Sequence, residues 1–533
     1  MKIRIVLASL CLMAGCEHLL YGQAQAVSPQ ESSKVSLLES VRAALENHPL
    51  LRSQQAQVEI NRGLREQASG AFDRIDQTTF SNDLQTTPLT AGQQLTNRDA
   101  GLVGASQKVH STNFGLSLDQ PLRNGMELTG GIQTGRSVDN LFAATGVNSS
   151  TMNLTLRIPL LRGRGRRVAA ATEEAAKSEV DAASLDLQHL AAQLTSNVAT
   201  SYWTLVAARR SVAIAVDAEQ RGRTYLDDVQ QLVKADHAPA NDLHEVVANL
   251  AQRTSSRISA EQQLVSAEQQ LSLDMGTNVD DLVRQRLEPT DTLPDGEGQA
   301  LPSDSSESIR YYVEQALQRR ADCHASRVRV EEQGILFQAA RNRLLPQLDL
   351  NAFGGYSGLQ EGRSVGNFYS DAFQGIHGPS AGLGLTYTFP HRNQAAHGAL
   401  LQAQGANRQA ELQNKELERT IGSSVVVAVE AVRSAIVRVK QARAAVRSFQ
   451  SALTGERDKY SGGIGSIVEI LTVEDKLNSA LSDEVQAELN YALAVVQFRF
   501  ATGTLLSAGQ GTQSLSYENF VSAPFQGAPL DKQ

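Results

Sequence analysis

The chain has 533 residues, of which 41% are hydrophobic, 20% are charged and only 5% are aromatic, and its net charge is −8. This apolar share supports a substantial core and excludes a disordered or collagen-like chain. The acidic balance does not favour a nucleic-acid partner, which would require a basic stripe, and we expect none. Three cysteines are too few for a disulfide scaffold.

The first 26 residues have the pattern of a secretory signal. Lys2 and Arg4 precede an apolar stretch, Ile5–Gly15, that is too short to span a bilayer. Two processing sites compete. An ordinary signal peptidase would cut after Ala26, whereas a lipobox-like stretch would end the signal before Cys16 and leave that cysteine lipidated. Either route predicts that the chain leaves the cytoplasm.

Beyond the leader, no segment is expected to cross a membrane as a helix. The most apolar run, Val425–Val439, is interrupted by Glu430, Arg433 and Arg438. If this chain enters a membrane, closed β-structure is the remaining way to satisfy its backbone hydrogen bonds there.

The chain repeats itself. The pairs Ala44-Leu45 and Val58-Glu59 recur at one constant offset as Ala316-Leu317 and Val330-Glu331. Each copy then changes from a helical to an alternating pattern, so that each half is predicted to contain a helix, strands, a proline, a long helix, a turn and a further helix. We assign the repeats to residues 36–290 and 305–507, and expect a flexible tail over 508–533.

The helices are predicted to be very long. No proline occurs between Pro159 and Pro239, or between Pro390 and Pro524. A helix from about residue 166 to residue 234 would reach roughly 100 Å. Apolar residues recur at spacings of three, four and seven after Val425, which indicates a seam for other helices. Such stripes require a helical barrel or a coiled-coil array.

Short alternating segments predict strands. The strongest hairpin signal is Asn124-Gly125. The first half has an extra hairpin in one interpretation, so its strand count stays open. The expected strand segments are 114–118, 128–132, 153–158, 348–353 and 382–389. Residues 84–111 and 357–379 are expected to be mobile loops.

Several motifs occur together in one order. They are the segments Ala44–Pro49, Pro159–Gly165, Tyr202-Trp203, Tyr460–Leu471 and Ala501–Gly503. From about residue 36 to residue 507 the chain resembles the TolC-type outer-membrane efflux proteins. The segment that begins at Tyr460 is the most specific, because it is similar to a family pattern of tyrosine, glycine, serine, an acidic residue and leucine.

This resemblance implies a mainly α fold with β-structure: a trimeric outer-membrane β-barrel continued by a long α-helical periplasmic barrel. It also implies a homotrimer in outer-membrane lipid that works with a periplasmic adaptor and an inner-membrane pump. The expected function is the exit duct of a tripartite efflux pump or a type I secretion system. The alternative is a structural lipoprotein that spans the periplasm without a pore, which would not need the alternating segments.

The resemblance points to the helix tips as a gate. Glu469 and Asp242 occupy the acidic positions that would form rings around a three-fold axis; the alternative is a carboxylate that stabilises a helix start. Tyr460 matches a latch tyrosine, or else only packs between helices. Gly465 stands where the family often has arginine, and Gly463 is expected to mark a tight turn.

A basic cluster lies where strand meets helix, and we expect no catalytic site. The cluster contacts lipid headgroups in one interpretation and is a solvated first helical turn in the other. It comprises Arg162, Arg164, Arg166 and Arg167. Cys323 is predicted to be a buried, inert thiol. We expect no enzyme activity, cofactor or metal site, because no catalytic or metal-ligand spacing occurs.

Overall fold

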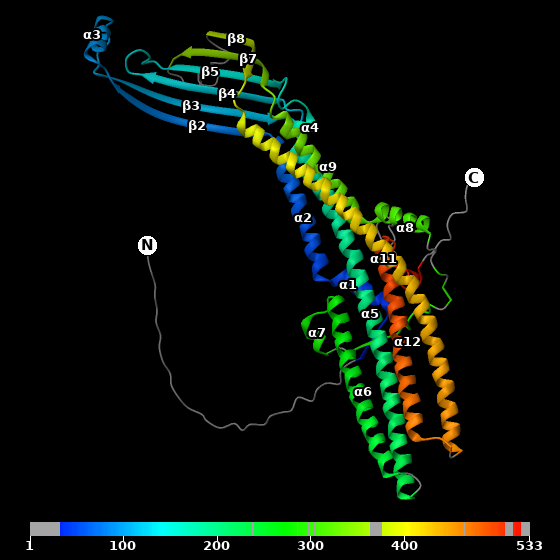
Figure 1. Cartoon of the computed structure of the whole chain (residues 1–533). Helices are drawn as coiled ribbons and strands as arrows, with labels where there is room; N and C mark the ends of the chain where they lie inside the picture. The colour runs from blue at the N-terminus through cyan, green and yellow to red at the C-terminus, as the bar shows by residue number, and fades with distance from the viewer. Residues whose placement is uncertain are drawn as a thin grey trace, which may run out of the picture.

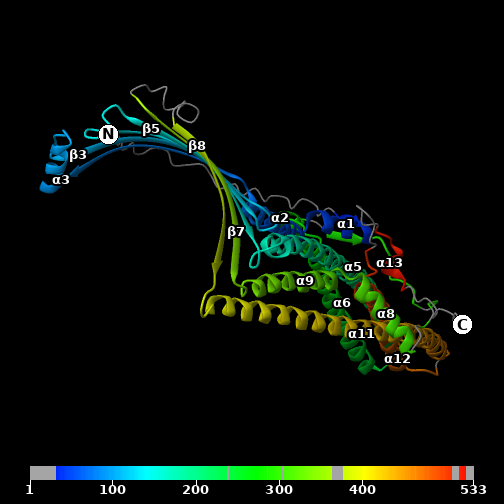
Figure 2. The same cartoon turned by 90° about the horizontal axis from the view of Figure 1, so that it is seen from above.

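The computed structural model describes residues 32–236, 239–284, 286–296, 298–299, 301, 305–362, 376–462, 464–506 and 515–523. A β-sheet lies at one end, and long helices run from it to the opposite end (Figure 1). Figure 2 shows the same arrangement from above, with the curved sheet beyond the helices. The predicted fold class, mainly α with a β part, is confirmed.

Two helical hairpins make up most of the helical part. In the first, α5 (Ala171–Lys234, 64 residues) packs along α6 (Ala240–Asp274). In the second, α11 (Gln394–Ser461, 68 residues) packs along α12 (Ile467–Ala501). The remaining helices are α1 (Leu37–Asn47), α2 (Pro49–Ser69), η1 (Gly70–Phe72), α3 (Ala91–Asp99), α4 (Arg166–Ala169), α7 (Val279–Arg284), α8 (Ser306–Arg319), α9 (Ala321–Asn342) and α13 (Glu518–Val521).

The predicted repeat is visible in the order of these elements. In the first half α1 and α2 lead to strands and then to the α5–α6 hairpin; in the second half α8 and α9 lead to strands and then to the α11–α12 hairpin. The first long helix differs from prediction in one respect. It is interrupted at Ala170, so that the short α4 precedes α5.

A stripe of valines explains why α11 stays helical over its length. Val425, Val429, Val432 and Val439 are all buried in the helical core, and they recur on one face at helical spacing. A fully buried valine contributes roughly 1.5 kcal/mol or more relative to an exposed one. Tertiary packing of this stripe therefore stabilises a helix that would be marginal by propensity alone.

The main sheet has six antiparallel strands in the order β2-β3-β4-β5-β7-β8. Four strands come from the first repeat and two from the second. They are β2 (Ile75–Pro88), β3 (Ser106–Pro121), β4 (Glu127–Asp139), β5 (Val147–Pro159), β7 (Gln347–Glu361) and β8 (Ile376–Thr388). The predicted Asn124-Gly125 hairpin is confirmed, because it joins β3 to β4.

The sheet has one apolar and one polar face. Because directly paired residues point to the same side, the register places Leu116 of β3 beside Ile132 of β4 and, further along, Leu350 of β7 beside Leu385 of β8. On the opposite face Arg157 of β5 forms an ion pair with Glu127 of β4. The alternation therefore divides the side chains by polarity between the two faces.

Two segments expected to be mobile loops contain regular structure. Within and beside 84–111, the chain forms most of the β2–β3 hairpin with α3 at its tip. Within 357–379, residues 357–361 continue β7 and residues 376–379 begin β8. The expectation was wrong here because β2 is rich in threonine, asparagine and aspartate, and its alternation is carried by few apolar residues.

A second, two-stranded sheet and part of the C-terminal tail complete the core. β1 (Ser32–Val35) pairs in parallel with β6 (Arg286–Pro289). Residues 515–523, inside the tail expected to be flexible, pack on the helices: Phe520 is fully buried. Arg499 of α12 donates to the carbonyl oxygen of Ser522, Nη2 to O, at 2.7 Å.

By length and composition, one helix in the described part of the chain could cross a membrane, and this helix is α11. The expectation that no segment beyond the leader approaches such a span is wrong by that measure. Core helices of soluble proteins also pass this test of length and composition. The buried valine stripe of α11 accounts for its apolar composition.

Candidate gate at the helix tips

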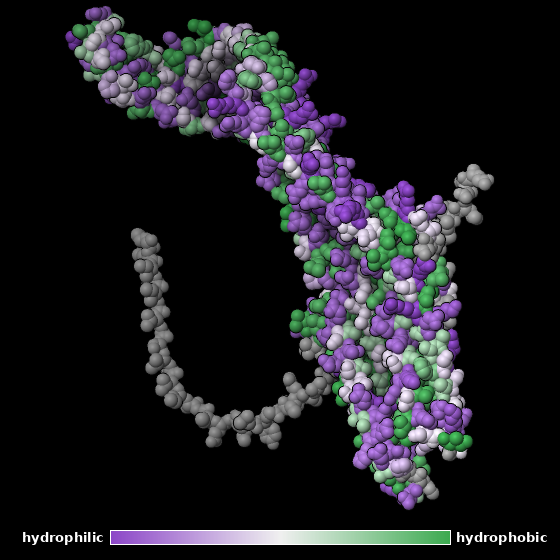
Figure 3. Space-filling view, in the orientation of Figure 1, coloured by the Kyte–Doolittle hydropathy of each residue, from purple (hydrophilic) through white to green (hydrophobic). Residues whose placement is uncertain are grey.

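The two helical hairpins turn at the end farthest from the sheet (Figure 1). The space-filling view shows hydrophilic and hydrophobic side chains interspersed over the helical part (Figure 3). Below that surface, a cluster of apolar residues from α5, α6, α11 and α12 forms the core near the tips. We call it the tip cluster, and its buried members are Val229, Val246, Val446, Leu453, Ile467, Ile470, Leu471, Leu477 and Ala480.

The first hairpin turns through a strained residue. Asp236 has φ 61°, in the left-handed region. This region suits glycine, and aspartate tolerates it at a cost. The backbone thus keeps the turn of a glycine although the side chain is acidic.

The two predicted acidic residues lie in the first turns of their helices. Asp242 is in the first turn of α6, with its backbone N–H bonded to the Pro239 carbonyl at 3.1 Å. Glu469 is exposed and closes a capping box with Ser466, whose backbone N–H donates to Glu469 Oε2 at 3.3 Å. Glu469 therefore has a structural role at the start of α12, whichever role it has in a pore.

Tyr460 lies in the space between the two hairpins. It is half-buried and packs on the tip cluster. Burial raises the pKa of its hydroxyl, and the nearby carboxylates of Asp228 and Asp242 raise it further. The structure therefore brings Tyr460 and Asp242 together, although they are 218 positions apart in the chain.

The shape of the turn explains why position 465 is a glycine and not the arginine that the family often has there. A Cβ at this position would lie 3.1 Å from the backbone nitrogen of Tyr460, so the turn leaves little room for a side chain. The backbone N–H groups of Ile464 and Gly465 both bond to the Lys459 carbonyl, at 3.0 and 3.3 Å. Gly463, predicted to mark the tight turn, lies outside the described residues.

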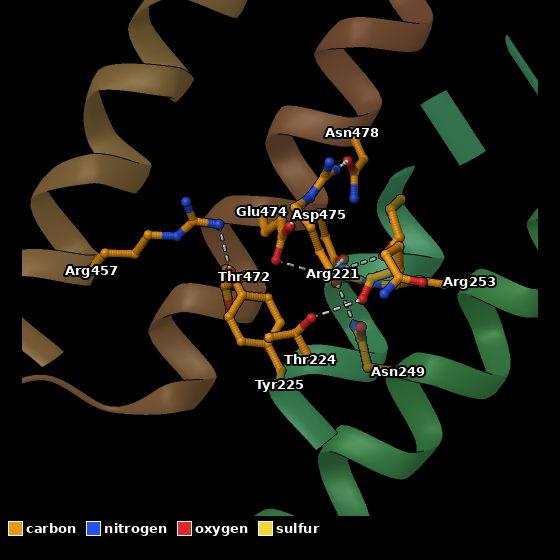
Figure 4. Close-up of polar contacts among 12 residues, drawn as sticks. Arg221, Thr224, Tyr225, Asn249, Arg253, Arg457, Thr472, Glu474, Asp475 and Asn478 are labelled. Atoms are coloured by element: carbon orange, nitrogen blue, oxygen red, sulfur yellow. Dashed lines mark hydrogen bonds and ion pairs between the residues drawn. The ribbon is translucent and has the colours of Figure 1, made fainter. Parts of the chain in front are cut away.

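A buried polar network ties the two hairpins together (Figure 4), and the sequence analysis missed it. Its centre is Glu474 of α12, whose side chain has no exposed surface. Arg221 of α5 forms an ion pair with one carboxylate oxygen, and Arg253 of α6 approaches the other at 3.4 Å. We call this set the tip network; its members are Arg221, Asn249, Arg253, Glu474, Asp475 and Asn478.

The outer members of the tip network extend the contact between α6 and α12. Arg253 Nη2 donates to Asp475 Oδ1 at 3.1 Å, and Asn249 Nδ2 donates to Asp475 Oδ2 at 3.0 Å. Arg221 Nη2 donates to Asn478 Oδ1 at 2.7 Å. One signal was present in the sequence, because Glu474 interrupts the apolar spacing of Ile467, Ile470, Leu471 and Leu477 on α12.

One further contact brings α11 to the first hairpin. Arg457 Nη2 donates to the Tyr225 hydroxyl at 2.8 Å. Arg457 lies three residues before Tyr460, the predicted latch tyrosine. An arginine–tyrosine contact therefore does join the two hairpins, but its tyrosine is Tyr225 and not Tyr460. All four helices at the tip are thus connected by polar side chains.

The basic cluster lies at the other end of the helices, between β5 and α5. Arg166 Nη2 contacts Glu174 Oε1 at 2.8 Å, whereas Arg164 and Arg167 are exposed. Arg162 is half-buried in the loop before α4. The cluster therefore sits where the sheet meets the helical part, as predicted from its place in the sequence.

Two predicted features remain, the thiol of Cys323 and the lipidation site Cys16. Cys323 of α9 is fully buried, and burial raises the pKa of its thiol. Cys16 lies outside the described residues. Among the described residues, no group of three or more histidine, cysteine, aspartate or glutamate side chains could hold a metal ion.

The fold, with its sheet and paired long helices, is that of outer-membrane efflux channels. Residues 312–504 match the family described as "Outer membrane efflux protein". The chain is 23% identical over 346 residues to the outer membrane protein TolC of Escherichia coli (strain K12); the match covers 63% of this chain and 66% of TolC, slightly less than two thirds of its length. These matches confirm the resemblance predicted from the motifs.

Solved structures of low sequence identity share the fold. The outer-membrane channel OprN superposes with a TM-score of 0.63 at 17% identity, over 88% of this chain and 90% of that chain. The CmeC outer membrane channel of Campylobacter jejuni gives a TM-score of 0.63 at 16% identity, over 88% and 85%. Both proteins are described as outer-membrane channels.

Proposed function

We propose that this chain is the outer-membrane exit duct of a tripartite efflux pump or a type I secretion system, and that it conducts substrates passively to the exterior. One observation carries the proposal: a sheet with one apolar face continues into helices of 64 and 68 residues. The sheet suits a membrane and the helices suit the periplasm.

The strands have the length and the alternation that a lipid-facing wall requires. Each has 13 to 16 residues, and a transmembrane strand needs about 9–11. The apolar side chains are exposed in a single copy: Leu383 is 77% exposed. A structural lipoprotein without a pore leaves this face without a role, so the channel is the better explanation.

Three copies of the chain close the wall in this proposal. Six strands are too few to enclose a channel, because even a small barrel needs about eight. Edge strands of the sheet therefore pair between neighbouring copies. The helical hairpins of the homotrimer form the periplasmic tunnel, which a periplasmic adaptor grips near the tips and connects to an inner-membrane pump.

The gate lies at the tips. In the trimer, Asp242 and Glu469 form acidic rings near the axis, and these rings attract cations and repel anions. The tip network and the Arg457–Tyr225 contact hold each α11–α12 hairpin against α5–α6, and Tyr460 packs between the hairpins. At the opposite end, the exposed arginines of the basic cluster contact lipid headgroups.

The test is single-channel conductance of the purified protein in a planar bilayer with a salt gradient. We expect discrete steps whose reversal potential indicates cation preference. Glu469→Gln removes the charge but keeps an acceptor for the capping box, so it should weaken the cation preference without unfolding the tip. Asp242→Asn is the equivalent change on α6.

A closed tip could hide the conductance of the wild type, so an opened variant completes the test. Glu474→Gln breaks the centre of the tip network, and Glu314→Gln, on an exposed pair with Arg310, is the matched control. Silence in the wild type and in Glu474→Gln contradicts the channel. Steps with unchanged selectivity in Glu469→Gln and Asp242→Asn keep the channel and reject the acidic rings.

A further inference from the structure

The first repeat adds a complete extra hairpin to the sheet. All 14 residues of β2 pair with β3, from Ile75 opposite Asp119 to Pro88 opposite Ser106. β3 pairs as continuously with β4. Every strand from β2 to β8 pairs with its neighbour in one continuous sheet. β2 and β3 therefore belong to the same sheet as β4, β5, β7 and β8.

The base of this hairpin is fixed to the helical part. Gly165 N donates to the Asn124 carbonyl at 2.9 Å, in the turn between β3 and β4. A Cβ at Gly125, whose φ is 90°, would lie 2.1 Å from the Gly163 carbonyl oxygen, so this turn fits against the β5–α4 loop only with glycine. Arg123 of the same turn makes a two-pronged ion pair with Glu173 of α5, at 2.7 and 2.8 Å.

The apolar face continues across the extra hairpin to both outer strands. Phe80 of β2 lies opposite Phe114 of β3. When the residue pairs are followed from β3 across β4, β5 and β7 to β8, Phe80 and Phe114 lie on the same face of the sheet as Leu383 and Leu385. Phe80 and Leu383 are 71% and 77% exposed. Both outer strands thus present apolar side chains to the same side, as neighbouring wall strands would.

The directions of the outer strands allow the pattern to continue into a second copy. β2 runs away from α2, whereas β8 returns toward α11, so the two strands are antiparallel (Figure 1). We propose that β8 of one copy pairs with β2 of the next, and that three copies close a barrel of eighteen strands with all six strands of each copy in the wall. This inference rests on the homotrimer of the proposed function.

The strand number sets the width of the duct. With strands about 4.8 Å apart and tilted by about 40°, eighteen strands enclose a barrel about 36 Å across, and twelve strands one of only about 24 Å. The wall then forms a wide aqueous mouth, and the restriction to flow lies at the helix tips. The extra hairpin thereby adds width and no selectivity.

Cysteine pairs across the seam test the assignment, in a Cys323→Ala background. Ile75 lies level with Gly382 across one sheet. A tilted barrel of eighteen strands adds a stagger of about six to eight residues per copy, so Ser380→Cys is combined with Ser81→Cys, Asp83→Cys or Gln85→Cys on the same polar face. At least one combination should give a covalent trimer under oxidation.

The matched control places the second cysteine on β4, in Gln133→Cys or Ser137→Cys. β4 lies between β3 and β5, so it can meet β8 of a neighbour only if the extra hairpin leaves the wall. We expect no covalent oligomer from these pairs. Oligomers from the β4 pairs instead of the β2 pairs overturn the inference.

Electron cryomicroscopy of the protein in lipid nanodiscs gives a second test, independent of the cysteine pairs, because the strands in the barrel wall can be counted directly. Eighteen strands around the axis support the inference. A conducting trimer with twelve wall strands overturns it but keeps the proposed function. A particle that is neither trimeric nor conducting overturns both.

Discussion

Glu474 and Arg221 form an ion pair between α12 and α5 in which the carboxylate has no exposed surface. Removing a carboxylate from water costs several kcal/mol, and only close cationic partners offset this cost. Arg253, itself 5% exposed, supplies the second partner. Such a pair contributes little net stability, but it requires that α5, α6 and α12 stay together. We therefore expect the closed tip of the proposed channel to depend on this contact.

The first prediction concerns this carboxylate. Glu474→Gln leaves two guanidinium groups without their buried counter-charge, and breaking a buried pair costs about 3–5 kcal/mol. We expect a lower melting temperature and more frequent open-channel steps. The control Glu314→Gln, on a pair whose side chains are 81% and 60% exposed, should change neither quantity. A lower melting temperature without more openings would limit the tip network to a structural role.

The second prediction concerns the contact between Arg457 and Tyr225. Tyr225→Phe and Arg457→Ala each remove the same hydrogen bond, which is worth about 1 kcal/mol at a solvent-accessible site. We expect each variant to raise the open probability severalfold, and the double variant to add little to either. Fully additive effects in this double-mutant cycle would show that the two side chains act separately.

The third prediction concerns the strained turn of the first hairpin. A left-handed residue other than glycine costs roughly 1–2 kcal/mol, and Asp236 has φ 61°. Asp236→Gly should therefore raise the melting temperature slightly, since greater freedom of the unfolded chain offsets part of the gain. Asp236→Val should lower it, because a β-branched side chain suits this conformation poorly. The reverse order would mean that the aspartate side chain stabilises the turn.

The fourth prediction is a pH dependence that arises from α9. Burial, followed by the nearby Glu179 carboxylate, raises the pKa of Glu332 to about 7, although Arg329 acts in the opposite direction and lowers it. Because the folded pKa lies above the unfolded value of about 4.3, the folded state favours the neutral carboxyl. Its stabilising contribution is complete below the unfolded pKa and is lost as the pH rises through about 7.

Glu332→Gln tests this sign. The variant keeps a neutral side chain at every pH, so between about pH 5 and about pH 8 its melting temperature should fall less than that of the wild type. Since Glu332 is only half-buried, the difference should be on the order of 1 kcal/mol after solvent screening. Parallel pH profiles for the two proteins would contradict the raised pKa.

Much of the architecture could be predicted because it follows from periodic patterns. The proline-free stretches and the valine spacing of α11 indicate long packed helices without any tertiary information. The Asn124-Gly125 pair indicates its hairpin because such turns need a left-handed backbone that few residues other than glycine adopt, and Gly125 has φ 90°. β2 was missed because its exposed strand residues are mostly polar, and only pairing with β3 over 14 residues stabilises it.

The candidate site was harder to predict because its contacts join distant parts of the chain. Asp242 and Tyr460 were assigned by position, and the structure shows them to be near each other. The tip network joins residues more than 200 positions apart, so no local pattern predicts which arginine approaches Glu474. Phe520 was assigned to a flexible tail because its neighbours are polar, yet it fills a gap in the core.

The last prediction concerns the middle of the molecule, where α5 meets the two-stranded β1–β6 sheet. The Tyr202 hydroxyl donates to Asp291 Oδ2 at 2.7 Å, and the same carboxylate oxygen accepts from the Leu37 backbone N–H at 2.9 Å. Tyr202→Phe leaves this carboxylate with one donor fewer, which should cost about 1.5–3 kcal/mol for a bond to a charged group.

Trp203, the single tryptophan, measures this loss directly. It is fully buried, and its ring lies 5.4 Å from that of Tyr202. Wild-type tryptophan emission should therefore be blue-shifted and should move to the red in one step on heating. In Tyr202→Phe this step should come at a lower temperature. In Tyr311→Phe, which removes only an exposed contact with Gln315, it should stay in place. If both variants melt like the wild type, the Tyr202–Asp291 bond does not hold the β1–β6 sheet to α5.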